Sequence, residues 1–342
     1  IEAVDQLARQ YLTRRQVELG ESINPEDFPH ELQKVKAHIA LHQVFGVDLN
    51  ATAVELAERG LKVAVVETNK GDRDNVFAAP DANGNWSGFD IAICKAVAAA
   101  VLGDATKVKY IPTTGQTRFT ALSSGEVDVL ARNSTWTFQR DTDLKLDFAG
   151  VNYYDGQGFM VRKDLGVSSA KELDGATICI QTGTSTELNL ADWFRANNMT
   201  YQPVNIDSNA EGEQQYMAGA CDAYTTDASG LAATRAAFAD PENHIILPEI
   251  ISKEPLGPAV RHGDNNWGDI VRWVLYALIS GEEYGVTSAN IEELSKSSTN
   301  PDVQRMLGAT DDYGAMLGLD KEWAKRAIAA SGNYGEIFDR NV

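Results

Sequence analysis

Apolar and polar positions along residues 60–342 change period repeatedly, and these changes predict strands that alternate with helices. A short apolar strand is predicted at 61–66 and an alanine-rich, apolar helix at 90–102. A helix at 118–124 and a strand at 127–130 follow. Because strands alternate with helices, the sequence predicts an α/β protein with right-handed crossovers between its strands.

One combination of helix, glycine and strand occurs twice. A helix ended by Gly125 leads to a strand that opens on Asp128, and the same order returns about 95 residues later at Gly219 and Asp222. Glycine suits these positions because the residue that ends a helix often takes a positive φ. Two occurrences at matching places predict two lobes that are built alike.

Polar side chains follow the predicted strands at the ends where open α/β folds bind ligands. Asn133, Thr135 and Arg140 come directly after the strand at 127–130. An arginine held there can bind a carboxylate through two parallel hydrogen bonds, which lysine cannot match. A solvated loop with a surface arginine is the alternative for this segment taken alone.

Two further segments complete this pattern. Thr184 and Ser185 lie between a strand and a helix, where they either help to form an anion site or simply cap the helix. Asp227 ends the strand after the second glycine and can accept hydrogen bonds from an ammonium group. An arginine with hydroxyl groups for a carboxylate, and an aspartate for an amine, together predict a clamp for a zwitterion.

Charge and cysteine content exclude several classes of protein. The formal net charge of −19 makes a nucleic acid an unfavourable partner. The three cysteines lack the spacing of a zinc site, the histidines are scattered, and no cofactor or metal is expected. No apolar run approaches the roughly 18 residues that span a membrane. The sequence opens at Ile1 in a helical pattern, and no signal peptide is visible there.

Four stretches of the chain together resemble one protein family. They are similar to the general L-amino-acid-binding proteins of ABC transporters, which are periplasmic solute-binding proteins for polar amino acids, and the resemblance covers about 59–342. The stretches are APDANGNWSGFDIAICKAVAAAVLGDATKVKY at 79–110, TRFTALSSGEVDVLARNSTWTFQRD at 117–141, the segment 153–201 and CDAYTTDASGLAA at 221–233.

The resemblance implies an α/β, two-lobed periplasmic binding protein type II fold with two hinge crossovers. Lobe one is expected to comprise 60–154 and 253–342, and lobe two 157–250, with crossovers near 153–158 and 248–253. The implied function is extracytoplasmic, periplasmic binding of a free L-amino acid and its delivery to the membrane permease components of an ABC importer. A monomer without a cofactor is expected.

The resemblance also assigns roles to individual residues. Arg140 and Thr135, with the loop around Asn133, are expected to hold the ligand α-carboxylate. Thr184 and Ser185 are expected to complete that cage from lobe two, and Asp227 to take the α-ammonium. Arg118 is expected near the ligand side chain. Trp136 either walls the side-chain pocket or packs in the protein interior.

The cysteines carry a separate prediction. Cys179 and Cys221 lie on strands that should be neighbours in the sheet of lobe two, so a disulfide is expected in an oxidising compartment. Two buried free thiols are the alternative. The family often has a cysteine in its first strand that pairs with the one at Cys94. Ala64 stands at that place here, so Cys94 is expected to be free and buried.

Residues 1–59 do not fit this family and predict a mostly helical N-terminal extension. The segment FGVDLNATAVELA at 45–57 resembles the second strand of adenine-specific DNA methyltransferases of restriction systems. The glycine-rich turn and the Asn-Pro-Pro-aromatic motif of those enzymes are missing from the sequence, so Asp48 alone cannot serve such a site. A non-functional methyltransferase-fragment fusion is kept as an alternative for this part. The charged segment 67–77 also departs from the family, which has a Gly-Leu-Pro-Gly-Phe-type loop there.

A catalytic function is the main rival, because a few relatives of this fold are dehydratases. Catalysis needs a positioned acid or base, and neither His244 nor His262 lies in a predicted binding segment. The sequence therefore predicts a binding protein without catalytic residues. A dehydratase-like enzyme on the same fold remains the alternative.

Overall fold

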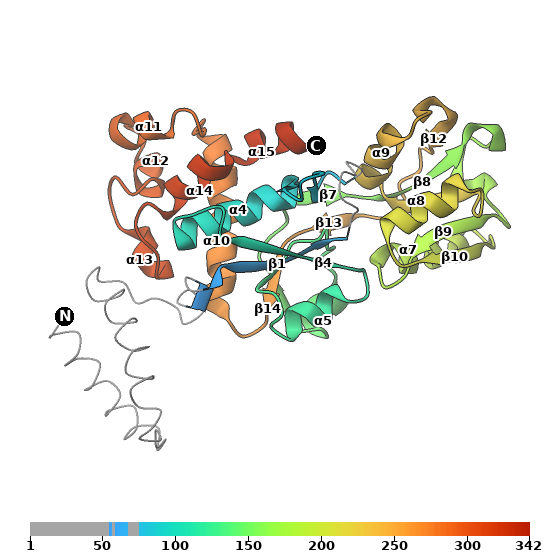
Figure 1. Cartoon of the computed structure of the whole chain (residues 1–342), viewed down its shortest axis with the longest axis horizontal. Coiled ribbons are helices and arrows are strands. Elements are labelled where there is room, and N and C mark those ends of the chain that lie inside the picture. Colours follow the sequence, from blue (N-terminus) through green and yellow to red (C-terminus); the bar gives the residue numbers. More distant parts are fainter. Residues whose placement is uncertain (1–54, 57–58, 68–74) are drawn as a thin grey trace, which may run out of the picture.

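The computed structural model describes residues 55–56, 59–67 and 75–342, and the predictions for 1–54 lie outside this part. Two α/β lobes lie side by side, each built around one five-stranded sheet (Figure 1). We call them lobe one, which contains β1, β4, β5, β6 and β14, and lobe two, which contains β8 to β12.

Lobe one is assembled from distant parts of the chain. Its sheet has the order β4-β1-β5-β14-β6, in which β1 runs parallel to β4 and β5, and β14 runs antiparallel to β5 and β6. The strands are β1 Leu61–Val66, β4 Val108–Thr113, β5 Val129–Leu130, β6 Leu146–Phe148 and β14 Ala259–Arg261. The helices packed around it include α4 Phe89–Leu102, α5 Arg118–Ser123, α10 Asn265–Glu283 and α14 Trp323–Ser331.

Lobe two is continuous in sequence. Its sheet has the order β10-β9-β11-β8-β12, with β9 parallel to β10 and β11, and β8 antiparallel to β11 and β12. The strands are β8 Gln157–Arg162, β9 Thr177–Gln181, β10 Gln202–Ile206, β11 Ala223–Asp227 and β12 His244–Ile246. Its helices are α7 Ser185–Ala196, α8 Asn209–Met217 and α9 Ala228–Ala237.

The chain passes between the lobes twice, and the two passages are hydrogen-bonded to each other. Strand β7 (Tyr153–Asp155) pairs antiparallel with β13 (Glu254–Leu256). Ile251 then donates its backbone N–H to the carbonyl of Gln157 at 2.9 Å. The crossovers near 153–158 and 248–253 therefore lie side by side.

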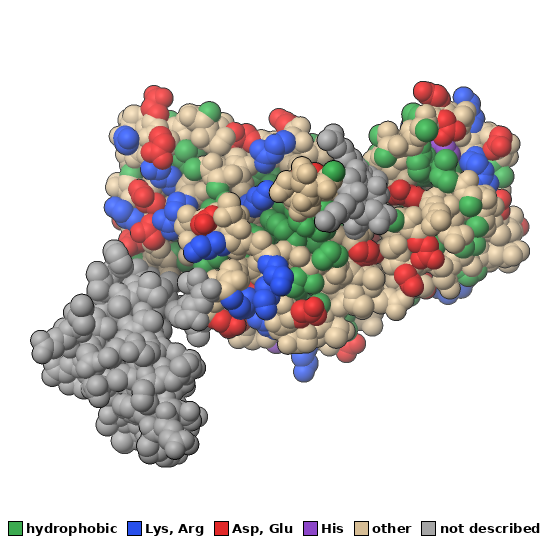
Figure 2. Space-filling view, viewed as in Figure 1, with side chains coloured by type: hydrophobic (Ala, Val, Ile, Leu, Met, Phe, Trp, Pro, Cys, Tyr) green, Lys and Arg blue, Asp and Glu red, His purple; other side chains and the backbone are tan. Residues whose placement is uncertain are grey.

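Smaller elements complete the described part of the chain. They are β2 Ala79–Pro80, β3 Trp86–Ser87, α6 Phe138–Thr142, α11 Ile291–Ser297, α12 Pro301–Met306, α13 Tyr313–Leu317 and α15 Tyr334–Asn341, with 3-10 turns at Lys163–Leu165, Ala170–Glu172 and Pro241–Asn243. On the face in Figure 2, charged side chains of both signs are spread over both lobes. None of the described helices combines the length and hydropathy needed to cross a membrane.

The repeated helix–glycine–strand pattern has the same function in both lobes. Gly125 and Gly219 have φ of 80° and 76°, as expected after a helix. The aspartate that follows each glycine then accepts a hydrogen bond from the backbone of a neighbouring strand, Asp128 from Lys62 at 2.9 Å and Asp222 from Thr177 at 2.8 Å. In both lobes, therefore, the aspartate after the glycine bonds to the backbone of the neighbouring strand.

The predicted strand at 127–130 is shorter in the structure, where β5 contains only Val129–Leu130. Val127 donates its N–H to the carbonyl of Ala121 in α5, at 3.2 Å, and so belongs to the turn that ends the helix. The strands and helices predicted at 61–66, 90–102 and 118–124 agree with β1, α4 and α5 to within one residue.

The disulfide between Cys179 and Cys221 is present, and it joins β9 to the residue just before β11 with a Cα–Cα distance of 5.6 Å. Cys94 is a buried free thiol, as predicted. The expectation that a cysteine at position 64 would be its partner was wrong. Side chains alternate across a strand, and Ala64 packs on the opposite face of β1 from Val63, Val65 and Cys94, so a cysteine at 64 would point away from Cys94.

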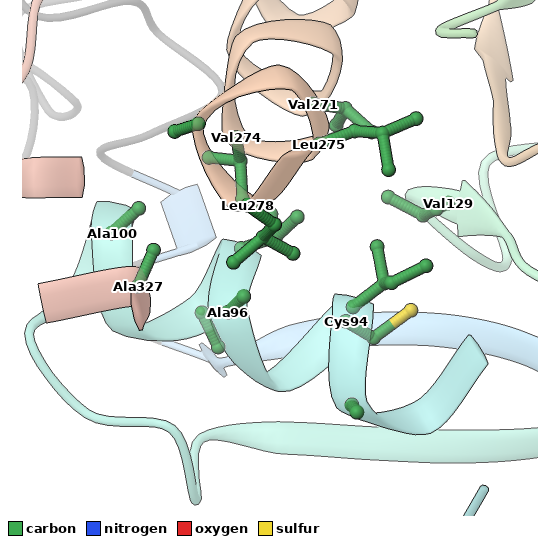
Figure 3. Packing of buried hydrophobic residues seen from close by; sticks show 14 of the residues in the cluster. Cys94, Ala96, Ala100, Val129, Val271, Val274, Leu275, Leu278 and Ala327 are labelled. Carbon is green, nitrogen blue, oxygen red and sulfur yellow. The ribbon is translucent and has the colours of Figure 1, made fainter. Parts of the chain in front are cut away.

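The main core of lobe one is formed where α10 and α14 pack on α4 (Figure 3). The small side chains Ala96 and Ala100 allow Leu278 of α10 and Ala327 of α14 to approach α4 closely. Arg326 fixes the contact by donating to the carbonyls of α4's last turn. These contacts hold the C-terminal half of α4 against α10 and α14.

Candidate ligand-binding site

A pocket lies between the two lobes, where the carboxyl ends of their strands converge. The pocket is partly open to solvent, and its empty space, open solvent included, is about 310 Å³. Every described residue that lines it is polar or charged. They are Arg118, Arg132, Asn133, Thr135, Gln181, Thr184, Ser185, Thr186, Asn209, Thr226 and Asp227. A pocket with this lining suits a small, charged and hydrophilic molecule.

Asn133 stands at the centre of the lobe-one side. Its φ of 31° lies in the left-handed region, which asparagine tolerates better than most residues. Its backbone N–H donates to the buried carboxylate of Asp90 at 3.0 Å, and Asn152 donates to the other oxygen at 2.8 Å. The Asn133 side chain then reaches Asp227 of lobe two at 3.4 Å. Burial raises the pKa of Asp90 to about 6.

Two arginines from lobe one lie next to each other. Arg118 lines the pocket, is 2% exposed, and has a buried Nε–H without a hydrogen-bond partner among the described residues. Arg140 is not among the lining residues, and its guanidinium donates to the carbonyl of Thr135 at 2.8 Å. Both guanidinium carbons lie within 5.0 Å of the centre of the Phe119 ring. Arg118 thus lines the pocket, near which the sequence predicted it, whereas Arg140, predicted to hold the carboxylate, lies outside the lining.

Burial affects the ionisation of these cations. It lowers the pKa of Arg140 to about 10, against the opposite influence of Glu254 and Asp227. Burial also lowers the pKa of Arg118, as do the neighbouring charges of Arg132 and Arg140. A bound anion would offset this unfavourable concentration of positive charge.

On the lobe-two side, Thr184 caps helix α7. Its hydroxyl accepts the N–H of Glu187 at 3.2 Å and donates to the carbonyl of Gln181 at 2.6 Å. The N–H of Gly183 donates to the Glu187 carboxylate at 2.9 Å. Thr184 therefore caps the helix, which was one of the two alternatives predicted for Thr184 and Ser185. It also lines the pocket.

Asp227 faces the arginines from the end of β11 and is 7% exposed. Burial raises its pKa to about 8, and the negative charges of Asp155 and Glu254 act in the same direction. Hydrogen bonding to Asn133 and the charge of Arg118 oppose this shift. An ammonium group placed beside Asp227 would supply the positive charge that its ionised form needs.

Several site residues were missed by the sequence analysis. Arg132 lines the pocket and forms an ion pair with Glu67 at 3.4 Å, and Gln181 of lobe two donates to the same carboxylate at 3.2 Å. Asn209 lines the pocket from the start of α8. Arg132 was accessible to the same reasoning as Asn133, because it too follows β5. Glu67 and Asn209 carry no such signal in the sequence.

Trp136 lies outside the pocket lining. Its ring stacks on that of Phe148, with centroids 5.4 Å apart, and 38% of the residue is exposed. The expected packing in the protein interior was therefore wrong, because the ring packs at the surface.

The lobes are in contact across the pocket. Gln116 of lobe one donates to Thr182 of lobe two at 2.6 Å, and the hydroxyl oxygens of Thr135 and Ser185 lie 3.1 Å apart. Together with the bond between Asn133 and Asp227, these contacts define a closed arrangement. The described residues contain no group of three or more potential metal ligands.

A two-lobed α/β protein with a closed, polar pocket between its lobes has the architecture of a solute-binding protein. The chain belongs to the bacterial extracellular solute-binding proteins, family 3, whose model matches residues 71–290. The fold is the type II periplasmic binding protein fold.

Individual members of the family are similar to this chain over most of its length. The glutamate/glutamine/aspartate/asparagine-binding protein BztA of Rhodobacter capsulatus is 71% identical over 266 residues, which cover 78% of this chain and 79% of that protein. The general L-amino acid-binding periplasmic protein AapJ of Rhizobium johnstonii is 61% identical over 268 residues, 78% of each chain. Both are named as binding proteins and not as enzymes.

A solved structure extends this similarity to three dimensions. The ABC transporter periplasmic binding protein from Brucella ovis with glutathione bound has a TM-score of 0.81 and 54% sequence identity. The comparison covers 86% of this chain and 91% of that one.

Proposed function

We propose that this protein binds a free L-amino acid with a polar side chain in the periplasm and delivers it to the membrane permease components of an ABC importer. One observation carries the proposal. The pocket contains an arginine whose buried Nε–H has no partner among the described residues on one side, and the carboxylate of Asp227 on the other. An α-amino acid has the two complementary charges on groups attached to the same carbon.

In this proposal the α-carboxylate binds between the guanidinium groups of Arg118 and Arg140. Guanidinium groups donate paired hydrogen bonds that match a carboxylate. Thr135, Thr184 and Ser185 surround that position. Their hydroxyl hydrogens are directed at protein acceptors, so in this proposal the arginines are the main donors to the carboxylate.

The α-ammonium is assigned to Asp227, with Asn133 orienting its carboxylate. The ligand side chain then extends toward Arg132, Gln181 and Asn209, which can donate to a carboxylate or an amide. The pocket offers no apolar wall among its described residues, which favours acidic and amide side chains over aliphatic ones. The name of BztA supports the same class of ligand, whereas that of AapJ covers L-amino acids in general.

Binding and release require the lobes to close and open. We propose that lobe one comprises 60–154 and 253–342, that lobe two comprises 157–250, and that the two hydrogen-bonded crossovers form the hinge. Each lobe supplies one half of the charge clamp, so a ligand stabilises the closed form over the open one. We also propose that the protein acts as a monomer, which light scattering of the purified protein can test.

A dehydratase-like activity is the alternative. It needs a general acid or base that can reach the ligand. His244 is buried in lobe two against the hydroxyl of Tyr216, and His262 pairs with Asp147 on the surface, so neither lines the pocket. NMR spectra of amino acids incubated with the protein should show no turnover.

Isothermal titration calorimetry tests the proposed function. We expect glutamate, glutamine, aspartate and asparagine to bind, and leucine to bind more weakly. Asp227→Asn should weaken glutamate binding strongly but affect glutarate, which lacks the amine, much less. Equal losses for both ligands would show that Asp227 is structural. Failure of all four polar amino acids to bind would refute the proposal.

A further inference from the structure

Glu254, the first residue of β13, has no role in the proposed clamp, yet its carboxylate is bonded to Thr135 and Ser185, which line the pocket. The residue is 1% exposed. One carboxylate oxygen accepts the hydroxyls of Thr135 and Ser185, the latter at 2.9 Å. The other accepts Asn189 at 2.6 Å and Ser252 at 2.5 Å. A buried carboxylate needs such partners, and hydrogen bonds to charged groups are the stronger ones.

The four donors belong to different parts of the fold. Thr135 lies in the loop 131–137 of lobe one, which we call the ligand loop. Ser252 lies in the second crossover, and Ser185 and Asn189 lie on helix α7 of lobe two. Among these donors, only those on α7 come from lobe two. A single carboxylate thus joins both lobes and the hinge.

Glu254 is attached firmly on the lobe-one side. The ligand loop is bonded to β13 by its backbone, with Trp136 donating to Pro255 at 2.8 Å and Gly257 donating to Ser134 at 3.1 Å. Strand β13 therefore moves with this loop. Separation of the lobes would preserve the contact between Glu254 and the loop.

The contacts to lobe two are made by side chains alone. Ser185 and Asn189 are four residues apart, so they lie on one face of α7. A negative charge near the first turn of this 12-residue helix is also favourable. Opening of the cleft would break both hydrogen bonds and expose the carboxylate.

From this geometry we propose that Glu254 is a positioning residue that holds lobe two against the ligand loop of lobe one in the closed state. The proposal rests on the proposed function in one respect, which is that ligand release requires the cleft between the lobes to open. Glu254 acts on the ligand through Thr135 and Ser185, whose hydroxyls it orients, and it sets how long the cleft stays closed.

The chain offers a matched control. Glu249 lies five residues earlier in the same crossover, and its carboxylate accepts the N–H of Ala170 at 3.0 Å and the hydroxyl of Ser169 at 2.5 Å. Both partners belong to lobe two. Glu249→Ala thus removes a hydrogen-bonded carboxylate from the crossover without removing a contact between the lobes.

Spin-label distances test the proposal without any ligand. Cysteines replace Lys107 of lobe one and Ala196 of lobe two, which are both exposed, while Cys94 stays buried and the disulfide stays formed. We expect Glu254→Ala to lower the fraction of closed molecules and to raise the dissociation rate of L-glutamate at least tenfold. Asn189→Ala, which is less disruptive, should shift both quantities in the same direction, and Glu249→Ala should shift neither.

Closed fractions that are equal in wild type and Glu254→Ala, with and without L-glutamate, would overturn the proposal. An equal effect of Glu249→Ala would also overturn it, because the loss would then come from the crossover and not from the contact between lobes. If wild type failed to bind any amino acid, the proposed function would be refuted, and the ligand-free distances would still decide the role of Glu254.

Discussion

At the scale of single residues, Asp227 combines a functional charge with an unfavourable environment. In the unfolded chain an aspartate ionises near pH 4, whereas burial raises the pKa of Asp227 in the folded, ligand-free protein to about 8. Its contribution to stability is fully present below about pH 4. It is lost as the pH rises toward 8, because the unfolded chain then releases a proton that the folded protein retains.

We predict that Asp227→Asn stabilises the ligand-free protein at neutral pH. Asparagine fills the same space and cannot ionise, so the gain should grow from about pH 4 to pH 8 by up to about 1.4 kcal/mol per pH unit. Thermal unfolding of both proteins at pH 5, 6.5 and 8 measures it. A stability difference between the two proteins that does not change with pH would contradict the raised pKa of Asp227.

Arg118 and Arg140 are predicted to share the ligand carboxylate, so each substitution should weaken binding. Arg118→Ala and Arg140→Ala should each cost about 2–5 kcal/mol of binding free energy, since a buried carboxylate loses a charge partner. Calorimetry with L-glutamate measures this loss. Arg305→Ala, which removes an arginine paired with Asp302 on α12, is the control and should bind as wild type does. Wild-type affinity in both Arg118→Ala and Arg140→Ala would exclude the arginine clamp.

At the scale of elements, local patterns predicted the strands and helices well, because hydrophobic period and glycine position act over a few residues. The loops after β5 and β11 were found in the same way, since polar residues after a strand are a local signal. Glu254 was missed because its partners Thr135 and Asn189 are 119 and 65 residues away in sequence. The positions of Arg118 and Arg140 relative to the pocket likewise depend on packing around Phe119, which no sequence pattern encodes.

The loop before α7 yields a prediction about closure. Gly183 has a φ of +73°, and a Cβ there would lie 2.9 Å from the Gln116 side chain and 3.2 Å from its backbone, across the cleft. We expect Gly183→Ala to weaken ligand binding, because the closed form must shift to accept the methyl group. Calorimetry with L-glutamate measures the effect.

Gly175→Ala separates this effect from backbone strain. Gly175 has a similar φ of +79°, but a Cβ would meet nothing within 4 Å. Both variants should lose about 1 kcal/mol of folding stability, and only Gly183→Ala should lose affinity. Equal affinities would mean that the lobes do not approach this closely when ligand binds.

At the scale of the whole molecule, the disulfide between Cys179 and Cys221 stabilises one lobe only. It closes a loop with a sequence separation of 42, for which chain entropy gives about 4 kcal/mol. We predict that the Cys179→Ala/Cys221→Ala double variant unfolds about 20 °C lower in the transition of lobe two. Calorimetric unfolding measures it, and Cys94→Ala, which leaves the bridge intact, is the control. An unchanged lobe-two transition would contradict this role.

The number of reactive thiols offers an independent check. Unreduced, denatured protein should take up one alkylating group, at Cys94, as measured by mass spectrometry. Three groups would show that the bridge does not form in solution.

The interrupted course of lobe one has a consequence for how the molecule is made. During synthesis, the sheet of lobe two is complete once β12 has been translated, whereas lobe one still lacks β14, which fills the gap between β5 and β6. Its helical layer comes later still, because Arg326 must reach back to the carbonyls of Ala99 and Ala100. Contacts between such distant residues form slowly. Lobe two should therefore fold first, and lobe one should complete its fold beside it only when the last quarter of the chain has emerged.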